Sequence, residues 1–156
     1  MTTPNWPNQL ILHEGEVGAA DTFLNHFDLG KIRIKRVWAI PEETQAAHAT
    51  ILLEVKLGTV ADPDRYAHLT NDSDLTTSLV TDPDGVIVSS AWTAKTMKEL
   101  DFAAKTVGNA PDAAAPGTPG GSYPEHSGVL ELTVVKAGTT PGAGRVTVGI
   151  DYFPSD

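Results

Sequence analysis

One segment of the sequence repeats acidic residues at a spacing that could serve a metal ion. Residues 62–85, DPDRYAHLTNDSDLTTSLVTDPDG, contain six aspartates in three D-x-D pairs: Asp62 and Asp64, Asp72 and Asp74, and Asp82 and Asp84. An EF-hand calcium loop needs oxygen ligands at its first, third and fifth positions, a glycine at the sixth and a bidentate glutamate at the twelfth. The spacing around these aspartates decides whether such a loop fits.

The aspartate spacing does not fit. A loop that began at Asp72 would place Thr77 at the sixth position and Pro83 at the twelfth, and a loop that began at Asp82 would reach Gly85 too early. Asp-Pro-Asp-Gly instead suits a tight turn, because aspartate accepts a backbone hydrogen bond, proline presets φ and glycine adopts the left-handed conformation. We therefore expect turns here, with a calcium site of another geometry as the alternative.

The residue types that enzymes commonly use in catalysis are scattered along the sequence. No histidine stands in an H-x-x-x-H or H-E-x-x-H arrangement, and no G-x-S-x-G elbow is present. Glu42 and Glu43 could form a carboxylate pair, although such neighbours on a loop usually stay solvated. PGTPGG and TTPGAG match neither a phosphate-binding loop nor a dinucleotide fingerprint. We expect no enzyme activity, no catalytic residue, no cofactor and no metal ligand, and we expect surface or turn positions for His13, His26, His48, His68 and His126.

Composition further limits the kinds of protein and partner that the sequence allows. The 156 residues suit one domain, and the net charge of -9 argues against nucleic acid and anionic membrane as partners. The absence of cysteine removes disulfides and thiolate sites. The start, MTTPNWPNQ, lacks the features of a secretory signal, and no apolar run reaches about 18 residues. We expect a soluble protein made in a cytoplasm.

Alternating apolar residues indicate strands. Residues 49–57 place Ala49, Ile51, Leu53, Val55 and Leu57 on one face. The same period occurs in 130–134 and 146–152, and the glycine- and proline-containing stretch KAGTTPGAG between them predicts a C-terminal hairpin. In 31–40, Arg36 interrupts a face that Trp38 and Ile40 resume, which a bulge near Lys35 would explain.

Shorter strands are expected at 66–69, 77–81 and 86–90, at intervals typical of a sandwich or barrel. Residues 91–107 fit either a helix or a strand, and the β character of the rest favours a strand. Residues 109–127, with four prolines and three glycines, predict a long exposed loop. Residues 1–9 predict an extended arm in which Trp6, between Pro4 and Pro7, either docks on a neighbouring subunit or folds back on its own domain, 10–156.

Four stretches together resemble small virion proteins of tailed bacteriophages, of the jelly-roll capsid decoration or cement type. They are KIRIKRVWAIPEE, DPDRYA, LVTDPDGVIVSSAWTAKTMKEL and GVLELTVVKAGTTPGAGRVTVGIDYFP. The resemblance is one of pattern over about residues 17–153, with no diagnostic motif. It implies an all-β fold, a single antiparallel β-sandwich of jelly-roll type. It also implies a noncatalytic protein on the capsid surface that binds the major capsid protein and clamps neighbouring capsid subunits. Binding at symmetry axes favours a homo-oligomer, with a trimer preferred.

Two alternatives remain. The chain could be a tail or fibre component of the same virion. It could also be a carbohydrate-binding β-sandwich that uses Trp38, Trp92 or Tyr123 as a platform for a sugar ring. Burial of Trp38 and Trp92 would remove the best feature of this second alternative.

Overall fold

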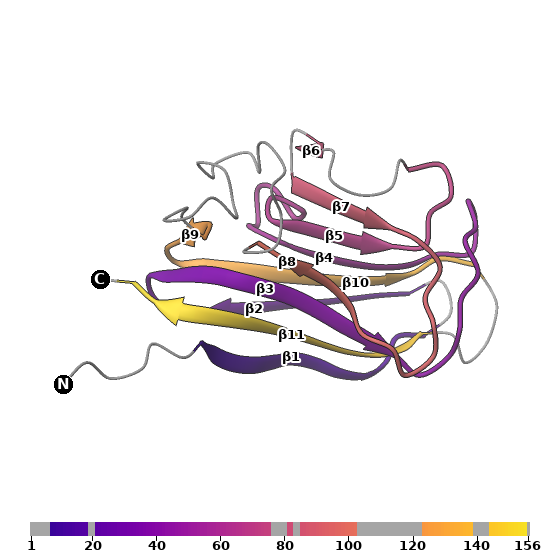
Figure 1. Ribbon diagram of the computed structural model, residues 1–156, viewed down its shortest axis with the longest axis horizontal. Coiled ribbons are helices and arrows are strands. Elements are labelled where there is room, and N and C mark those ends of the chain that lie inside the picture. Colours follow the sequence, from indigo (N-terminus) through magenta and orange to yellow (C-terminus); the bar gives the residue numbers. More distant parts are fainter. Residues whose placement is uncertain are drawn as a thin grey trace.

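The computed structural model describes residues 7–18, 21–75, 81–82, 85–102, 123–138 and 144–155. Every regular element among them is a strand, and the strands form two sheets packed face to face (Figure 1). The strands are β1 (Asn8–Glu16), β2 (Asp21–Asp28), β3 (Ile32–Pro41), β4 (Leu53–Gly58), β5 (Ala67–Thr70), β6 (Thr81–Asp82), β7 (Gly85–Ser89), β8 (Lys98–Asp101), β9 (Glu125–His126), β10 (Val129–Lys136) and β11 (Arg145–Pro154).

The strand order is that of a jelly roll. The first sheet runs β1-β11-β3-β8, with β9 also paired to β3, and the second runs β2-β10-β4-β5-β7-β6. Four antiparallel pairs, β1 with β11, β2 with β10, β3 with β8 and β4 with β5, arise when one long hairpin of strands is rolled up. The predicted β-sandwich is therefore confirmed. One pairing departs from the antiparallel expectation, since β7 runs parallel to β5.

The core lies between the sheets. Leu53, Val55 and Leu57 of β4 are buried, as the alternation predicted, but Ala49 and Ile51 precede the strand. The chain turns at that point, where Nδ1 of His48 accepts the backbone N–H groups of Thr50 and Ile51 at 2.9 and 3.2 Å. The main core cluster also includes Ile32, Ile34, Val37, Leu100, Phe102, Leu130, Leu132, Val134, Val146, Val148 and Ile150.

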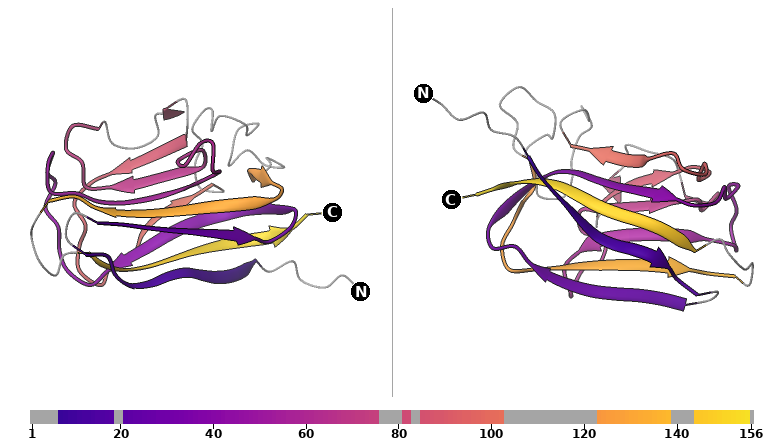
Figure 2. Two further views of the ribbon diagram at one scale, coloured as in Figure 1. Left: turned by 180° about the vertical axis from the view of Figure 1, so that it is seen from behind. Right: turned by 90° about the horizontal axis from the view of Figure 1, so that it is seen from below.

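The predicted C-terminal hairpin is wrong. Strand β10 lies between β2 and β4 in one sheet, and β11 lies between β1 and β3 in the other (Figure 2). Alternation reports which side chains face the core, and that face is the same whether the next strand pairs directly or crosses to the opposite sheet. Entry into β11 is fixed by a hydrogen bond of 3.1 Å from the N–H of Val17 to the carbonyl of Gly144.

The bulge predicted near Lys35 is confirmed. Asp151 pairs with Arg36 and Tyr152 with Ile34, so Lys35 is the extra residue on β3. The insertion reverses the two faces of the strand. Ile32 and Ile34 face the core before it, and Val37 and Ala39 do so after it. Trp38 and Ile40 therefore stand on the outer face, opposite to the expectation that they resume the inner one.

The remaining predicted strands are either confirmed or lie partly outside the described residues. Strand β8 with buried Leu100 and Phe102 confirms a strand in 91–107, of which residues 103–107 lie outside the described residues. Strands β5 and β7 confirm those at 66–69 and 86–90. In the predicted segment 77–81, Thr81 begins β6 and the rest lies outside the described residues.

Two boundaries need correction. The predicted arm, residues 1–9, ends too late, because β1 begins at Asn8; residues 1–6, with Trp6, lie outside the described residues. The predicted loop 109–127 ends too late as well, because Glu125 and His126 pair with β3 as β9, and residues 109–122 lie outside the described part. A two-residue strand is too short to produce an alternating pattern. Strands β1 and β2 had no clear signal in the sequence.

Candidate functional site

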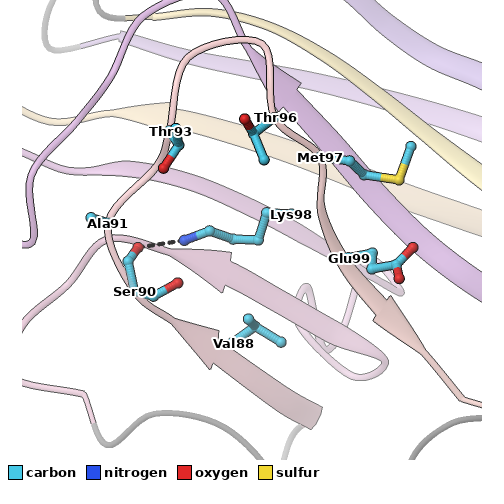
Figure 3. A pocket seen from close by; sticks show the side chains of 8 residues that line it. All are labelled: Val88, Ser90, Ala91, Thr93, Thr96, Met97, Lys98 and Glu99. Atoms are coloured by element: carbon cyan, nitrogen blue, oxygen red, sulfur yellow. Dashed lines mark hydrogen bonds between the residues drawn. The ribbon is translucent and has the colours of Figure 1, made fainter.

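A pocket beside the end of β7 and the start of β8 is the candidate site. Its cavity volume is about 220 Å³, and it opens to solvent. Figure 3 shows Lys98 reaching across it toward the carbonyl of Ser90. The lining consists of Val88, Ser90, Ala91, Thr93, Thr96, Met97, Lys98 and Glu99.

Lys98 is the charged group at the centre of this pocket. Its ammonium donates to the backbone carbonyl of Thr70 at 2.9 Å and to the carbonyl of Ser90. It also lies 4.1 Å from the centre of the Trp92 ring, close enough for a cation–π contact. Burial lowers the pKa of Lys98 to about 8. Two carbonyls and one aromatic face match the three N–H groups of an ammonium.

Trp92 forms the floor beneath Lys98. The ring is fully buried, and its Nε1 donates to the carbonyl of Leu53 at 2.9 Å. The backbone of Trp92 exchanges two hydrogen bonds of 2.8 Å with Gln45. Lys98 and Trp92 therefore join β8 to the ends of β5 and β7 and to the start of β4.

The pocket lacks the pairing that nucleophilic catalysis requires. Its hydroxyl groups belong to Ser90, Thr93 and Thr96, and no histidine lines it to act as their base. The carboxylate of Glu99 accepts a hydrogen bond of 2.8 Å from Arg36. A lysine of lowered pKa is a candidate nucleophile in general, but here the amine is already bonded to two carbonyls. We conclude that the pocket is a structural joint.

A second polar cluster lies on the outer face of the first sheet. Arg36 donates to Oδ2 of Asp151 from Nε at 2.8 Å and lies 2.7 Å from it through a second nitrogen. Trp38 donates from Nε1 to the other oxygen of Asp151 at 3.2 Å. The Trp38 ring lies over Gly149, where a Cβ would come within 2.2 Å of it. The bulge at Lys35 creates this cluster, because it turns Trp38 outward to join Arg36.

The expectation of surface or turn positions is wrong for two of the histidines, because His68 and His126 are buried. His68 lies on the outer face of the second sheet, 2.9 Å from Glu54 and 3.8 Å from Asp64. Burial alone would raise the pKa of Glu54. The hydrogen bond from His68 and the charges of His68 and Lys56 outweigh burial, so the pKa is lowered overall. This hydrogen-bonded pair lies between two neighbouring strands of one sheet, β4 and β5, a position in which it stabilises strand pairing.

His126 is the second buried histidine. Its Nδ1 lies 2.8 Å from the hydroxyl of Tyr66, and the two rings meet edge to face with centres 5.5 Å apart. Burial, ahead of the other influences, lowers the pKa of His126. The remaining histidines are more exposed: His26 lies 2.8 Å from Glu131, His13 packs on Phe23, and His48 closes a turn.

The aspartates act as turn residues wherever the structure describes them fully. Oδ1 of Asp72 accepts the backbone N–H of Asp74 at 2.8 Å, which is an Asx-turn. Asp62 lies 3.6 Å from Arg65, and Asp82 pairs with Gly85 across a chain reversal, as the turn interpretation predicted. Asp84 lies outside the described residues. Over the described ranges, no three histidine or acidic side chains are grouped closely enough to hold a metal ion.

The exposure of the glutamate pair and of three aromatic residues bears on the remaining expectations. Glu42 and Glu43 are exposed, as predicted. Trp38 is 4% exposed and Trp92 is 0% exposed, so neither ring can serve as a platform for a sugar. Tyr123 is half-buried, with its ring 5.4 Å from that of Phe153. The carbohydrate-binding alternative therefore loses its best feature.

Comparison of the chain with protein-family models, with curated proteins and with solved structures finds no match. None of the described residues belongs to a helix that is long and apolar enough to cross a membrane.

Proposed function

We propose that this chain is a noncatalytic structural protein of a tailed-phage virion, a capsid decoration protein that clamps neighbouring subunits of the head. The observation that carries the proposal is where its polar groups are used. The ammonium of Lys98, the guanidinium of Arg36 and the carboxylate of Asp151 are all bonded within the molecule. Bonded in this way, these three groups stabilise the fold and are not free to act as an acid, a base or a nucleophile.

The fold and the sequence support the same assignment. A jelly roll is one of the architectures used in viral capsids. The stretches that resemble decoration proteins coincide with β3, β7, β8, β10 and β11, which include three central strands of the sandwich. The partner on this account is the major capsid protein, and the chain sits on the capsid surface as a homo-oligomer, with a trimer favoured.

The test begins with purified virions of the phage that encodes the chain. Mass spectrometry should find the chain in stoichiometric amounts, and separated heads should retain it while separated tails do not. Purified protein should bind undecorated heads until a fixed number of sites is filled. Absence from virions would contradict the proposal as a whole, and recovery with tails would replace the head assignment by the tail alternative.

A further inference from the structure

Strand β2 leaves one long side without a partner. It is the margin of the second sheet and pairs with β10 over its full length of eight residues, without a shift in register (Figure 2). Among the described residues, no strand pairs with its other side. An edge of this kind offers a row of backbone donors and acceptors to another strand.

The neighbouring ladder shows which groups face outward. Leu52 and Ala137 exchange hydrogen bonds of 3.2 and 2.9 Å, so the odd-numbered residues of β10 bond to β4 and its even-numbered residues bond to β2. The register between β10 and β2 then assigns the odd-numbered residues of β2 to that ladder. The N–H and C=O groups that point away from the sheet belong to Thr22, Leu24, His26 and Asp28.

Two of these outward N–H groups are covered by side chains. The N–H of Thr22 donates to Oδ1 of Asp21 at 2.8 Å, and that of His26 donates to Oδ1 of Asn25 at 2.9 Å. These contacts agree with the assignment from the ladder. Each cover is a single local hydrogen bond on the exposed surface, and a rotation of the side chain releases it. Leu24 has no such cover, and its side chain is 53% exposed.

The other sheet margins are blocked in ways that rotation cannot reverse. β1 shifts register between Ile11 and His13, and Gly15 has a φ of 141°. β8 has four residues, and β6 has two. Bulges and short strands are the common means of preventing edge pairing. In the described structure, β2 is the long margin that remains regular.

Charge selects the kind of strand that fits. Antiparallel pairing of β2 with a second copy, centred on Leu24 or Asn25, brings Asp21 of one copy and Asp28 of the other to the same end of the interface, at both ends. Each copy also carries a net charge of -9. Like charges across strands oppose pairing, whereas a basic residue at each end would favour it. The edge therefore suits a basic strand of a different polypeptide.

We propose that the free edge of β2 binds an extended strand of another polypeptide, with lysine or arginine near both ends and an apolar residue against Leu24. The partner adds one strand to the sheet, as in β-augmentation. It displaces the side chains of Asp21 and Asn25 from the N–H groups of Thr22 and His26. The proposal does not depend on the phage assignment.

The test is a titration of the ¹⁵N-labelled full chain with a defined peptide, acetyl-KVTVTVTK-amide, followed by NMR. The amide signals of Thr22, Leu24, His26 and Asp28 should shift together, and those of β1 and β8 should not. The charge-reversed peptide acetyl-EVTVTVTE-amide should bind about tenfold more weakly, because it replaces two attractive contacts by repulsive ones. No shift in β2 at millimolar peptide, or equal binding of the two peptides, would overturn the proposal.

Two variants separate backbone from charge. Leu24→Pro removes an N–H that does not bond to β10, so the sheet should remain intact. Peptide binding should fall at least about tenfold. Leu24→Ala, which keeps that N–H, is the matched control. D21N/D28N should weaken the lysine peptide by about fivefold without altering the fold. If Leu24→Pro failed to fold, the double variant would still decide, since unchanged binding by it contradicts the proposal.

Discussion

The Lys98 pocket and the edge of β2 differ in how much of their hydrogen-bonding capacity is already used. At the pocket, the ammonium of Lys98 and the indole N–H of Trp92 beneath it each donate to a backbone carbonyl. Along β2, outward backbone N–H groups are either uncovered or held by a neighbouring side chain. A concave shape that holds a lysine of lowered pKa therefore need not be a binding site. Unused backbone groups are the better guide in this molecule.

The largest effect should come from removing the ring beneath Lys98. Trp92→Ala removes a fully buried ring and should lower the free energy of unfolding by about 3–5 kcal/mol. Leu24→Ala, on the β2 edge, should change it by less than about 0.5 kcal/mol. Denaturant unfolding of both variants measures the contrast. Similar losses at the two positions would show that the edge also belongs to the structural core.

A smaller loss should follow from removal of the ammonium. Lys98→Met keeps the aliphatic stem but removes the ammonium that donates to the carbonyls of Thr70 and Ser90, which should cost about 1–2 kcal/mol near pH 7. The carbonyl of Thr70 still accepts the N–H of Ser90 at 3.0 Å. Thermal unfolding of Lys95→Met, which alters an exposed lysine three residues before Lys98, supplies the control. Greater stability of Lys98→Met than of the unaltered chain would contradict the structural role of Lys98.

The pH dependence of the same residue should be smaller still. The pKa of Lys98 is about 8 in the folded chain, whereas an ordinary lysine has a pKa of 10.5, so between these values the unfolded chain binds more protons and stability rises with pH. Between pH 8 and pH 10, the free energy of unfolding of the unaltered chain should rise by about 1 kcal/mol relative to that of Lys98→Met, about half of what the full pKa shift would give, because the pocket opens to solvent and screening weakens the effect. Parallel curves for the two proteins would show that the ammonium is not desolvated.

The smallest effect concerns calcium. Because Asp72 accepts a hydrogen bond within its own turn and no described group of ligands is present, chelation should leave the melting temperature unchanged. Ligand binding to the native state must raise stability, so calorimetry with chelator and with added calcium is decisive. A melting temperature that falls by several degrees with chelator and is restored by calcium would place a binding site among the aspartates.

Alternation in the sequence was sufficient for the central strands. Val55, Leu132 and Val148 face the core as predicted, and the misplaced Arg36 located the bulge at Lys35. Alternation could not assign β10 and β11 to different sheets, because strand pairing depends on the path of the chain between them.

The site residues were harder to predict for a related reason. Lys98 is an ordinary surface residue by type, and its burial depends on Trp92 and on carbonyls far apart in sequence. His68 and His126 are buried by partners on other strands. Strand β2 was missed because a margin that is exposed over most of its length keeps little hydrophobic alternation. The feature that suits the strand for binding also concealed it in the sequence.

The most direct test of the account is hydrogen–deuterium exchange of the protein alone and bound to undecorated heads. Binding through the edge predicts slower exchange of backbone amides in residues 21–28, with no change in residues 90–99 around the pocket. Slower exchange confined to residues 90–99, with residues 21–28 unaffected, would contradict the account and make the pocket the binding surface.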